Sequence, residues 1–180
     1  MSATGTPATQ VASSAGVAYT LHSYDHDPGV VSYGLEAAQR MGVSPKRVAK
    51  TLVASVTRNN RPELVVGIVP VDGQLDLKAL AAVVGSKRAE MAPPSDVERS
   101  TGYVLGGVSP LGQRRKLSTV IDSSLLQHDT VFVSAGRRGL EIELSPHDLA
   151  TVASATVAAI VTYVSREESL PPARAPLSTS

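Results

Sequence analysis

Hydrophobic residues along this chain recur in short runs that glycine, proline and polar residues separate. Runs rich in β-branched residues and alternating patterns favour strands, whereas apolar positions three and four apart favour helices. The pattern predicts strands at residues 17–24, 51–57, 63–69, 119–121, 130–133 and 139–144. It predicts helices from Thr4 or Thr6 to Gly16, at 35–41, at 77–84 and from 145 to about 163, with a short helical turn after Ser44.

The order of these elements predicts an α+β fold. The turn-forming residues 58–62 lie between two predicted strands, which indicates a hairpin. In the strand at 139–144, apolar residues occupy every second position from Leu140 onward, so one face is expected to be buried. Glu141 points to the other face and is expected to be exposed.

Length and composition suit one globular domain. The chain has 180 residues, of which 42% are hydrophobic, and this is enough to form a core without disulfides or metal. The absence of cysteine excludes a disulfide framework and a thiolate zinc site. Because no apolar run approaches the length of a membrane span, we expect a cytoplasmic protein that does not contact membranes. We expect the domain at residues 6–164, a flexible N-terminus at 1–5 and a disordered tail at 165–180.

The segment from Ser100 to Lys116, called the glycine segment below, contains four glycines, one proline and three consecutive cations. Gly106 and Gly107 directly follow the apolar run at residues 103–105. We therefore expect a strand that ends in exposed backbone amides, where an anion or a carbonyl oxygen can bind. The segment is not a triphosphate-binding loop. Such a loop requires a lysine followed by a serine or threonine after its last glycine, and this chain has Gln113-Arg114 there.

The net charge of +1 is low for a protein that binds nucleic acid, but the cations are clustered. Ten of the 17 lysines and arginines fall in four groups: Lys46, Arg47 and Lys50; Lys87 and Arg88; Arg114, Arg115 and Lys116; Arg137 and Arg138. If the fold gathers these groups on one face, they can neutralise several phosphates. The alternative is that they are solvated loop charges.

Few side chains offer chemistry. Apolar residues flank Lys50, so its stem is expected to be buried and its ammonium to reach either a specific ligand or, in a purely structural role, solvent or a carboxylate. His22 and His26 would share one face of a strand, and with Asp25 or Asp27 they suggest a metal site. No third ligand has suitable spacing, so we expect no metal and no cofactor.

Several of these motifs resemble the YbaK-type aminoacyl-tRNA deacylases, which are related to the editing domain of bacterial prolyl-tRNA synthetases. The matching segments are Thr6-Pro7-Ala8, residues 22–28, 50–52, 73–78 and 90–92, the whole glycine segment, and residues 133–140. The resemblance implies a single domain with a mixed, largely antiparallel, curved or barrel-like sheet surrounded by helices. It also implies the acceptor end of a charged tRNA as the ligand and prolyl-tRNA synthetase as a partner.

The resemblance also implies roles for individual residues. It makes Lys50 catalytic, together with hydrogen-bond donors at Gly106 and Gly107. The Lys50 ammonium would contact either the ester carbonyl or the phosphate or ribose of the terminal nucleotide. Substrate contacts are implied for Tyr24, Thr51, Ser134, Gly136 and Glu141. Contacts with tRNA are implied for Lys46, Arg47, Arg114, Arg115, Lys116, Arg137 and Arg138. Two positions differ from the family: Ala135 replaces a common glycine, and Glu141 is longer than the aspartate of some members.

The implied activity is the clearance of mischarged Cys-tRNA(Pro), with Cys-tRNA(Cys) as a further substrate. The thiol of the substrate would attack its own ester carbonyl and leave as a cyclic thiolactone. The protein would then only orient the substrate and donate hydrogen bonds. Two alternatives remain: a deacylase of Ala-tRNA(Pro) that uses water as the nucleophile, and a non-catalytic module that binds tRNA or a synthetase.

Overall fold

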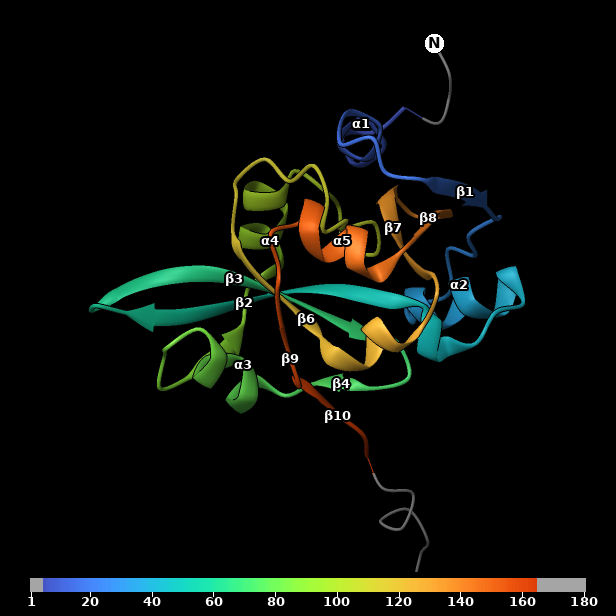
Figure 1. Ribbon diagram of the computed structural model, residues 1–180. Helices are drawn as coiled ribbons and strands as arrows, with labels where there is room; N and C mark the ends of the chain where they lie inside the picture. The colour runs from blue at the N-terminus through green and yellow to red at the C-terminus, as the bar shows by residue number, and fades with distance from the viewer. Residues whose placement is uncertain (1–4, 165–180) are drawn as a thin grey trace, which may run out of the picture.

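The strands are divided among three sheets in a computed structural model that describes residues 5–164 (Figure 1). The largest sheet has the order β5-β2-β3-β6-β9, with strands Ala89–Met91, Ala49–Arg58, Arg61–Pro70, Ser118–Asp122 and Thr156–Ala158. The second has the order β1-β8-β7, with strands Tyr19–Ser23, Leu140–Leu144 and Val131–Arg137. The third pairs β10 (Val161–Thr162) with β4 (Gln74–Leu75). The tail expected at 165–180 and most of the N-terminus expected at 1–5 lie outside the described residues.

Capping side chains explain where several helices begin. The helices are α1 (Pro7–Ser14), α2 (Tyr33–Met41), α3 (Leu77–Val83), α4 (Pro94–Thr101) and α5 (Pro146–Val152), with 3-10 turns η1 (Pro45–Arg47) and η2 (Ser123–Gln127). The side chains of Thr6, Asp76 and Ser145 accept hydrogen bonds from backbone amides in the first turns of α1, α3 and α5. These bonds satisfy donors that a helix leaves unpaired.

None of the described helices has the length and apolar character needed to cross a membrane.

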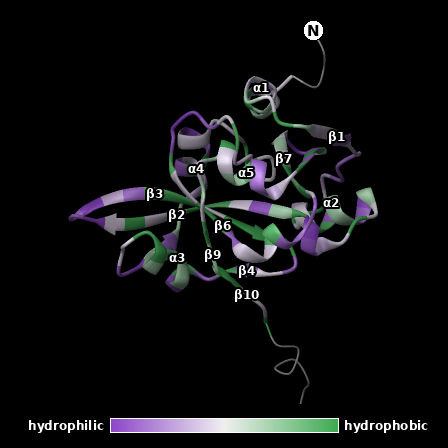
Figure 2. Ribbon diagram, viewed as in Figure 1, coloured by the Kyte–Doolittle hydropathy of each residue, from purple (hydrophilic) through white to green (hydrophobic). Residues whose placement is uncertain are grey.

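The hairpin expected around residues 58–62 is confirmed. Strands β2 and β3 pair antiparallel from Ala49 opposite Pro70 to Arg58 opposite Arg61. Asn59 and Asn60 connect them with positive φ angles of 49° and 58°, as a two-residue hairpin turn requires. Figure 2 shows polar residues at the tip of this hairpin. The other end of β2 lies inside the domain (Figure 1), and this is the end that carries Lys50.

Parallel and antiparallel pairs occur together in the largest sheet. β3 pairs in parallel with β6, and β6 with β9, whereas the other strand pairs are antiparallel. A parallel bridge from Val48 to Phe132 connects the start of β2 with β7, so the two larger sheets meet there. The α+β class with largely antiparallel strands is confirmed.

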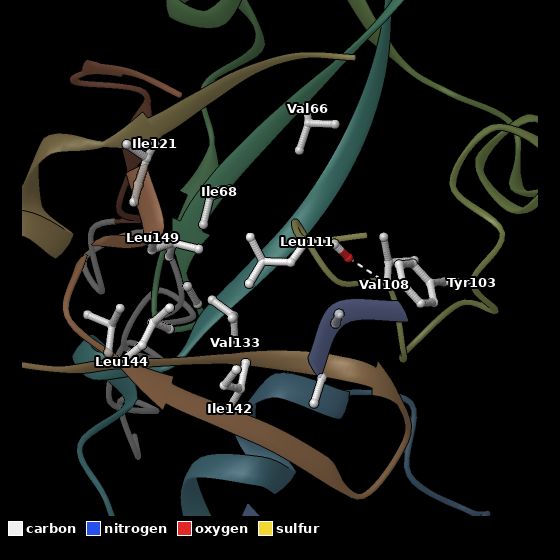
Figure 3. Packing of buried hydrophobic residues seen from close by; sticks show 14 of the residues in the cluster. Val66, Ile68, Tyr103, Val108, Leu111, Ile121, Val133, Ile142, Leu144 and Leu149 are labelled. Carbon is white, nitrogen blue, oxygen red and sulfur yellow. Dashed lines mark hydrogen bonds between the residues drawn. The ribbon is translucent and has the colours of Figure 1, made fainter. Parts of the chain in front are cut away.

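The main hydrophobic core lies between the two larger sheets (Figure 3). Ile68 of β3 and Val133 and Ile142 of β7 and β8 are fully buried in it. The glycine segment contributes to the same core through Leu111, which is only 1% exposed. Residues 107–111 of this segment are therefore part of the packed interior, whereas residues 104–105 and 114–116 lie at the surface.

The strand expected at residues 103–105 is absent, because the residues of this run have other partners. Tyr103 is buried in the core, and its hydroxyl donates a hydrogen bond of 2.7 Å to the Leu111 carbonyl (Figure 3). The Gly107 amide donates to the Val104 carbonyl at 2.9 Å, which closes a turn. Of this run, only Tyr103 packs into the core, since Val104 and Leu105 are 53% and 37% exposed.

The long helix expected from 145 to about 163 is also wrong in its second half. Helix α5 ends at Val152, and Ser154 has a φ of 51°. The chain then forms β9, which pairs in parallel with β6. The Asp122 carboxylate accepts a hydrogen bond of 2.7 Å from the Ile160 amide. These long-range partners compete successfully with local helix propensity.

Replacing Leu111 tests whether the glycine segment is part of the core. The Leu111→Ala variant should lose about 2 to 5 kcal/mol of unfolding free energy, because the substitution leaves a cavity. The matched variant Leu105→Ala, at a leucine that is 37% exposed, should lose less than about 1 kcal/mol. Urea denaturation of both variants measures the difference. Equal losses would contradict the interior position of Leu111.

Candidate functional site

A cavity of about 410 Å³ lies where the two larger sheets meet. Its walls come from the start of β2, the residues around the start of α2, the stretch from β5 to α4, the glycine segment, and strands β7 and β8. The expected site residues Lys50, Thr51, Gly106, Ser134 and Glu141 all line it. The fold therefore joins distant parts of the sequence around a space that suits a small ligand.

Strand β2 supplies Lys50 and Thr51. The Lys50 side chain is half-buried, and this burial lowers the pKa of its ammonium, although the charge of Asp72 partly opposes the effect. The Thr51 hydroxyl is buried and has no hydrogen-bond partner within the described part of the chain. A ligand in the cavity can therefore gain hydrogen bonds that the protein itself leaves unmade.

Strands β7 and β8 supply Ser134 and Glu141, which are directly opposite each other in the sheet. The expectation that Glu141 is exposed is wrong, since only 6% of its surface is accessible. The reason is that both faces of β8 are covered: the face with Ile142 by the core, and the other by the cavity walls. Burial raises the pKa of the Glu141 carboxyl to about 8, so it is mostly protonated at neutral pH.

The glycine segment contributes Gly106 to the cavity wall, whereas Gly107 lies outside it. Gly106 has a φ of 83°, and a Cβ atom there would lie 2.8 Å from the Tyr33 ring. The Gly107 amide already donates to the Val104 carbonyl, so it is not available to a ligand in this conformation. The Gly106 amide has no partner among the described residues. Of the two expected donors, Gly106 alone has a suitable place.

Tyr24 and Gly136 do not line the cavity, but each lies near a residue that does. The charge of Glu141, after burial itself, helps raise the pKa of the Tyr24 hydroxyl to about 12, which places the two side chains near each other. The Gly136 amide donates a hydrogen bond of 3.2 Å to the Ser134 hydroxyl. Both residues can therefore support the residues that contact a ligand.

The seven cations expected to contact tRNA lie in different settings. Lys46 and the run at residues 114–116 are exposed. Arg47 donates to the Thr130 carbonyl at 3.0 Å and pairs with Glu143. Arg137 and Arg138 follow Gly136 at the turn between β7 and β8, and the Arg138 guanidinium donates to the Leu105 carbonyl at 2.8 Å.

The two histidines of the possible metal site contact different carboxylates. His22 contacts Glu143 and His26 contacts Glu36, both at 2.7 Å. Strand β1 ends at Ser23, so His26 does not belong to the same strand as His22. Within residues 5–164, no group of three or more His, Asp or Glu side chains could hold a metal ion.

Sequence reasoning missed the apolar rim of the cavity. This rim consists of Val31, Leu35, Met91 and Leu105, which are 82%, 47%, 48% and 37% exposed. Nothing in the local pattern marks such residues as exposed, because exposure depends on which surfaces the fold brings together.

Taken together, the cavity offers donors and one carboxyl within mainly apolar walls. Lys50 and the Gly106 amide can donate to a carbonyl oxygen, while the rim can contact a larger apolar group outside. The Thr51 and Ser134 hydroxyls and Glu141 provide polar contacts for a small ligand. Such a site can bind an ester and stabilise negative charge on its carbonyl oxygen.

Comparison with known proteins gives one family. The aminoacyl-tRNA editing domain matches residues 27–152, which includes every residue of the cavity wall.

The proteins similar to this chain include the following two relatives and one solved structure. "Putative Cys-tRNA(Pro)/Cys-tRNA(Cys) deacylase EbsC" of Enterococcus faecalis is 38% identical over 125 residues, which cover 69% of this chain and 74% of that protein. The multifunctional Ser/Thr-tRNA deacylase ProXp-y of Escherichia coli is 34% identical over 106 residues, covering 58% and 64%. The crystal structure of "a putative trans-editing enzyme for prolyl tRNA synthetase" superposes with a TM-score of 0.72 at 24% identity, covering 90% and 99%, and shows the same fold.

The burial of Glu141 predicts a pH-dependent stability. An acid whose folded-state pKa is raised from 4.5 to about 8 binds more protons when folded, so stability should fall as pH rises between these values and then level off. At about 1.4 kcal/mol per pKa unit, the loss is at most about 5 kcal/mol. Glu141→Gln should remove this dependence, as urea denaturation from pH 5 to 8.5 can measure. Glu98→Gln, at an exposed glutamate, should retain it, and an unchanged slope in Glu141→Gln would contradict the assignment.

Proposed function

The chain belongs to the aminoacyl-tRNA editing domain family and is an aminoacyl-tRNA deacylase, and we propose that it clears Cys-tRNA(Pro) by using the thiol of the substrate. The main support for this proposal is that the described residues of the cavity wall include no activated nucleophile. A serine or threonine nucleophile needs an adjacent base. The Thr51 hydroxyl has no partner, the Ser134 hydroxyl accepts a bond from an amide, and Glu141 is mostly protonated.

In the proposed reaction, the cysteinyl sulfur attacks the ester carbonyl carbon of the same residue. The bond from this carbon to the ribose oxygen breaks, the ribose oxygen takes up the proton that the thiol has lost, and the amino acid leaves as a thiolactone. Holding thiol and carbonyl in reacting geometry can contribute about 7 to 11 kcal/mol. The Lys50 ammonium and the Gly106 amide donate to the carbonyl oxygen as charge develops on it.

The remaining site residues have proposed roles that follow from their positions. Thr51, Ser134 and Glu141 line the cavity and contact the aminoacyl group. Tyr24 and Gly136 support Glu141 and Ser134. Lys46, Arg47, Arg137 and the exposed run at residues 114–116 contact the tRNA backbone, with a strong dependence on salt.

We also propose that the protein acts in trans, alongside prolyl-tRNA synthetase, in the cytoplasm, and that Cys-tRNA(Cys) is a further substrate. The names of the similar proteins support this, since one refers to cysteinyl-tRNA and another to prolyl-tRNA synthetase.

Single-turnover deacylation of Cys-, Ser- and Ala-tRNA(Pro) tests the substrate and the role of Lys50. The wild type should clear the cysteinyl ester, and Lys50→Ala should lower this rate by roughly 10² to 10³, the usual cost of removing an oxyanion donor. Lys78→Ala, at an exposed lysine on α3, is the matched control and should keep the wild-type rate.

Two other outcomes of this panel would contradict the proposal. Clearance of the alanyl ester would show that water is the nucleophile, which contradicts the thiol mechanism. Binding of all three tRNAs without loss of any ester would show a non-catalytic module.

The proposed chemistry also predicts the pH dependence of the rate. The thiolate is the attacking form, and its reference pKa is about 8.5, so the single-turnover rate should rise roughly tenfold from pH 7 to 8.5. As the pH rises further, the rate should fall again. This fall should begin before pH 10.5, the ordinary pKa of a lysine, because burial lowers the pKa of the Lys50 ammonium. Rates corrected for spontaneous ester hydrolysis give this profile. A flat profile from pH 7 to 8.5 would contradict attack by the thiol.

A further inference from the structure

Arg138 makes two contacts at the mouth of the cavity. Its Nε donates a hydrogen bond of 2.8 Å to the Leu105 carbonyl, the residue directly before Gly106. The guanidinium carbon also lies 4.8 Å from the centre of the Tyr33 ring. That ring packs against Gly106, where a Cβ atom would lie 2.8 Å from it. The Arg138 side chain therefore contacts both the residue that precedes Gly106 in the chain and the ring that packs against Gly106.

The backbone beneath Arg138 is fixed to the same segment. A Cβ atom at Gly107 would lie 2.9 Å from the Arg137 Cα, so the two stretches of backbone are in direct contact. Arg138 thus extends from a point that already touches the glycine segment. Its planar guanidinium can donate a hydrogen bond and stack on a ring at the same time, which a lysine ammonium cannot do in this way.

We propose that Arg138 is a positioning residue that fixes the Gly106 turn and thereby the amide that faces the ester carbonyl. This inference rests on the proposed function, and it gives Arg138 a role other than the tRNA contact expected from the sequence. The hydrogen bond to Leu105 restrains the peptide before Gly106, and the stacked Tyr33 ring restrains Gly106 from the side. A donor displaced by about 1 Å can lower a rate by roughly a hundredfold.

A substrate without the tRNA body separates positioning from phosphate binding. We would measure kcat and KM with Cys-tRNA(Pro) and with the 3′-cysteinyl ester of adenosine, which lacks the phosphates of the tRNA. Arg138→Ala should lower kcat on both esters by the same factor, roughly tenfold to a hundredfold. Arg138→Lys should restore little, because it keeps the charge but loses the planar stack. Arg61→Ala, at the exposed start of β3, is the matched control and should leave both rates unchanged.

Three further variants and a second measurement distinguish positioning from a general folding defect. Tyr33→Leu should lower kcat as Arg138→Ala does, the double variant should be little worse than either, and Tyr33→Phe should stay close to wild type. Hydrogen exchange at residues 104–108 should become several times faster in Arg138→Ala, while the strands keep their protection.

Three results would overturn the inference. The first is an Arg138→Ala variant that is normal on the adenosine ester and weakened only on tRNA, with a reduced salt dependence, since this identifies a phosphate contact. The second is unchanged exchange at residues 104–108. The third is a wild-type protein that binds charged tRNA but cleaves neither ester, because this removes the proposed function itself.

Discussion

The direct contact between the backbones of Gly107 and Arg137 is the constraint on which the site depends. Close approach of two main chains requires a residue without a side chain, and here it joins the glycine segment to the turn between β7 and β8. The same two strands carry Ser134 and Glu141, while the segment carries Gly106. This contact therefore holds the glycine segment, with Gly106, against the pair of strands that carries Ser134 and Glu141.

Local signals in the sequence predicted the elements that local bonds determine. Thr6 and Ser145 cap the helices that were expected to begin there, and Asn59-Asn60 forms the expected hairpin turn. These signals failed where pairing with residues distant in the sequence determines the structure. The residues after Val152 form β9 because β6 offers its backbone, and no property of residues 153–163 alone shows this.

For the site, too, the sequence predicted some features and could not show those that depend on distant contacts. The family resemblance included Lys50, Thr51, Gly106, Ser134 and Glu141, and all of them line the cavity. The sequence could not show that Glu141 is buried, because alternation predicts one buried face and says nothing of what covers the other. Nor could it show that Arg138 contacts Leu105 and stacks on Tyr33, since these residues are far apart in the chain.

The position of the cavity at the junction of two sheets has a consequence for the folding of the chain. Lys50 belongs to the sheet built around β2, and Glu141 to the sheet of β1, β8 and β7. Neither sheet alone encloses a ligand, so a newly synthesised chain has no cavity until both have docked. A partly folded chain in which the two sheets have not met therefore lacks the site, and deacylation requires the complete fold.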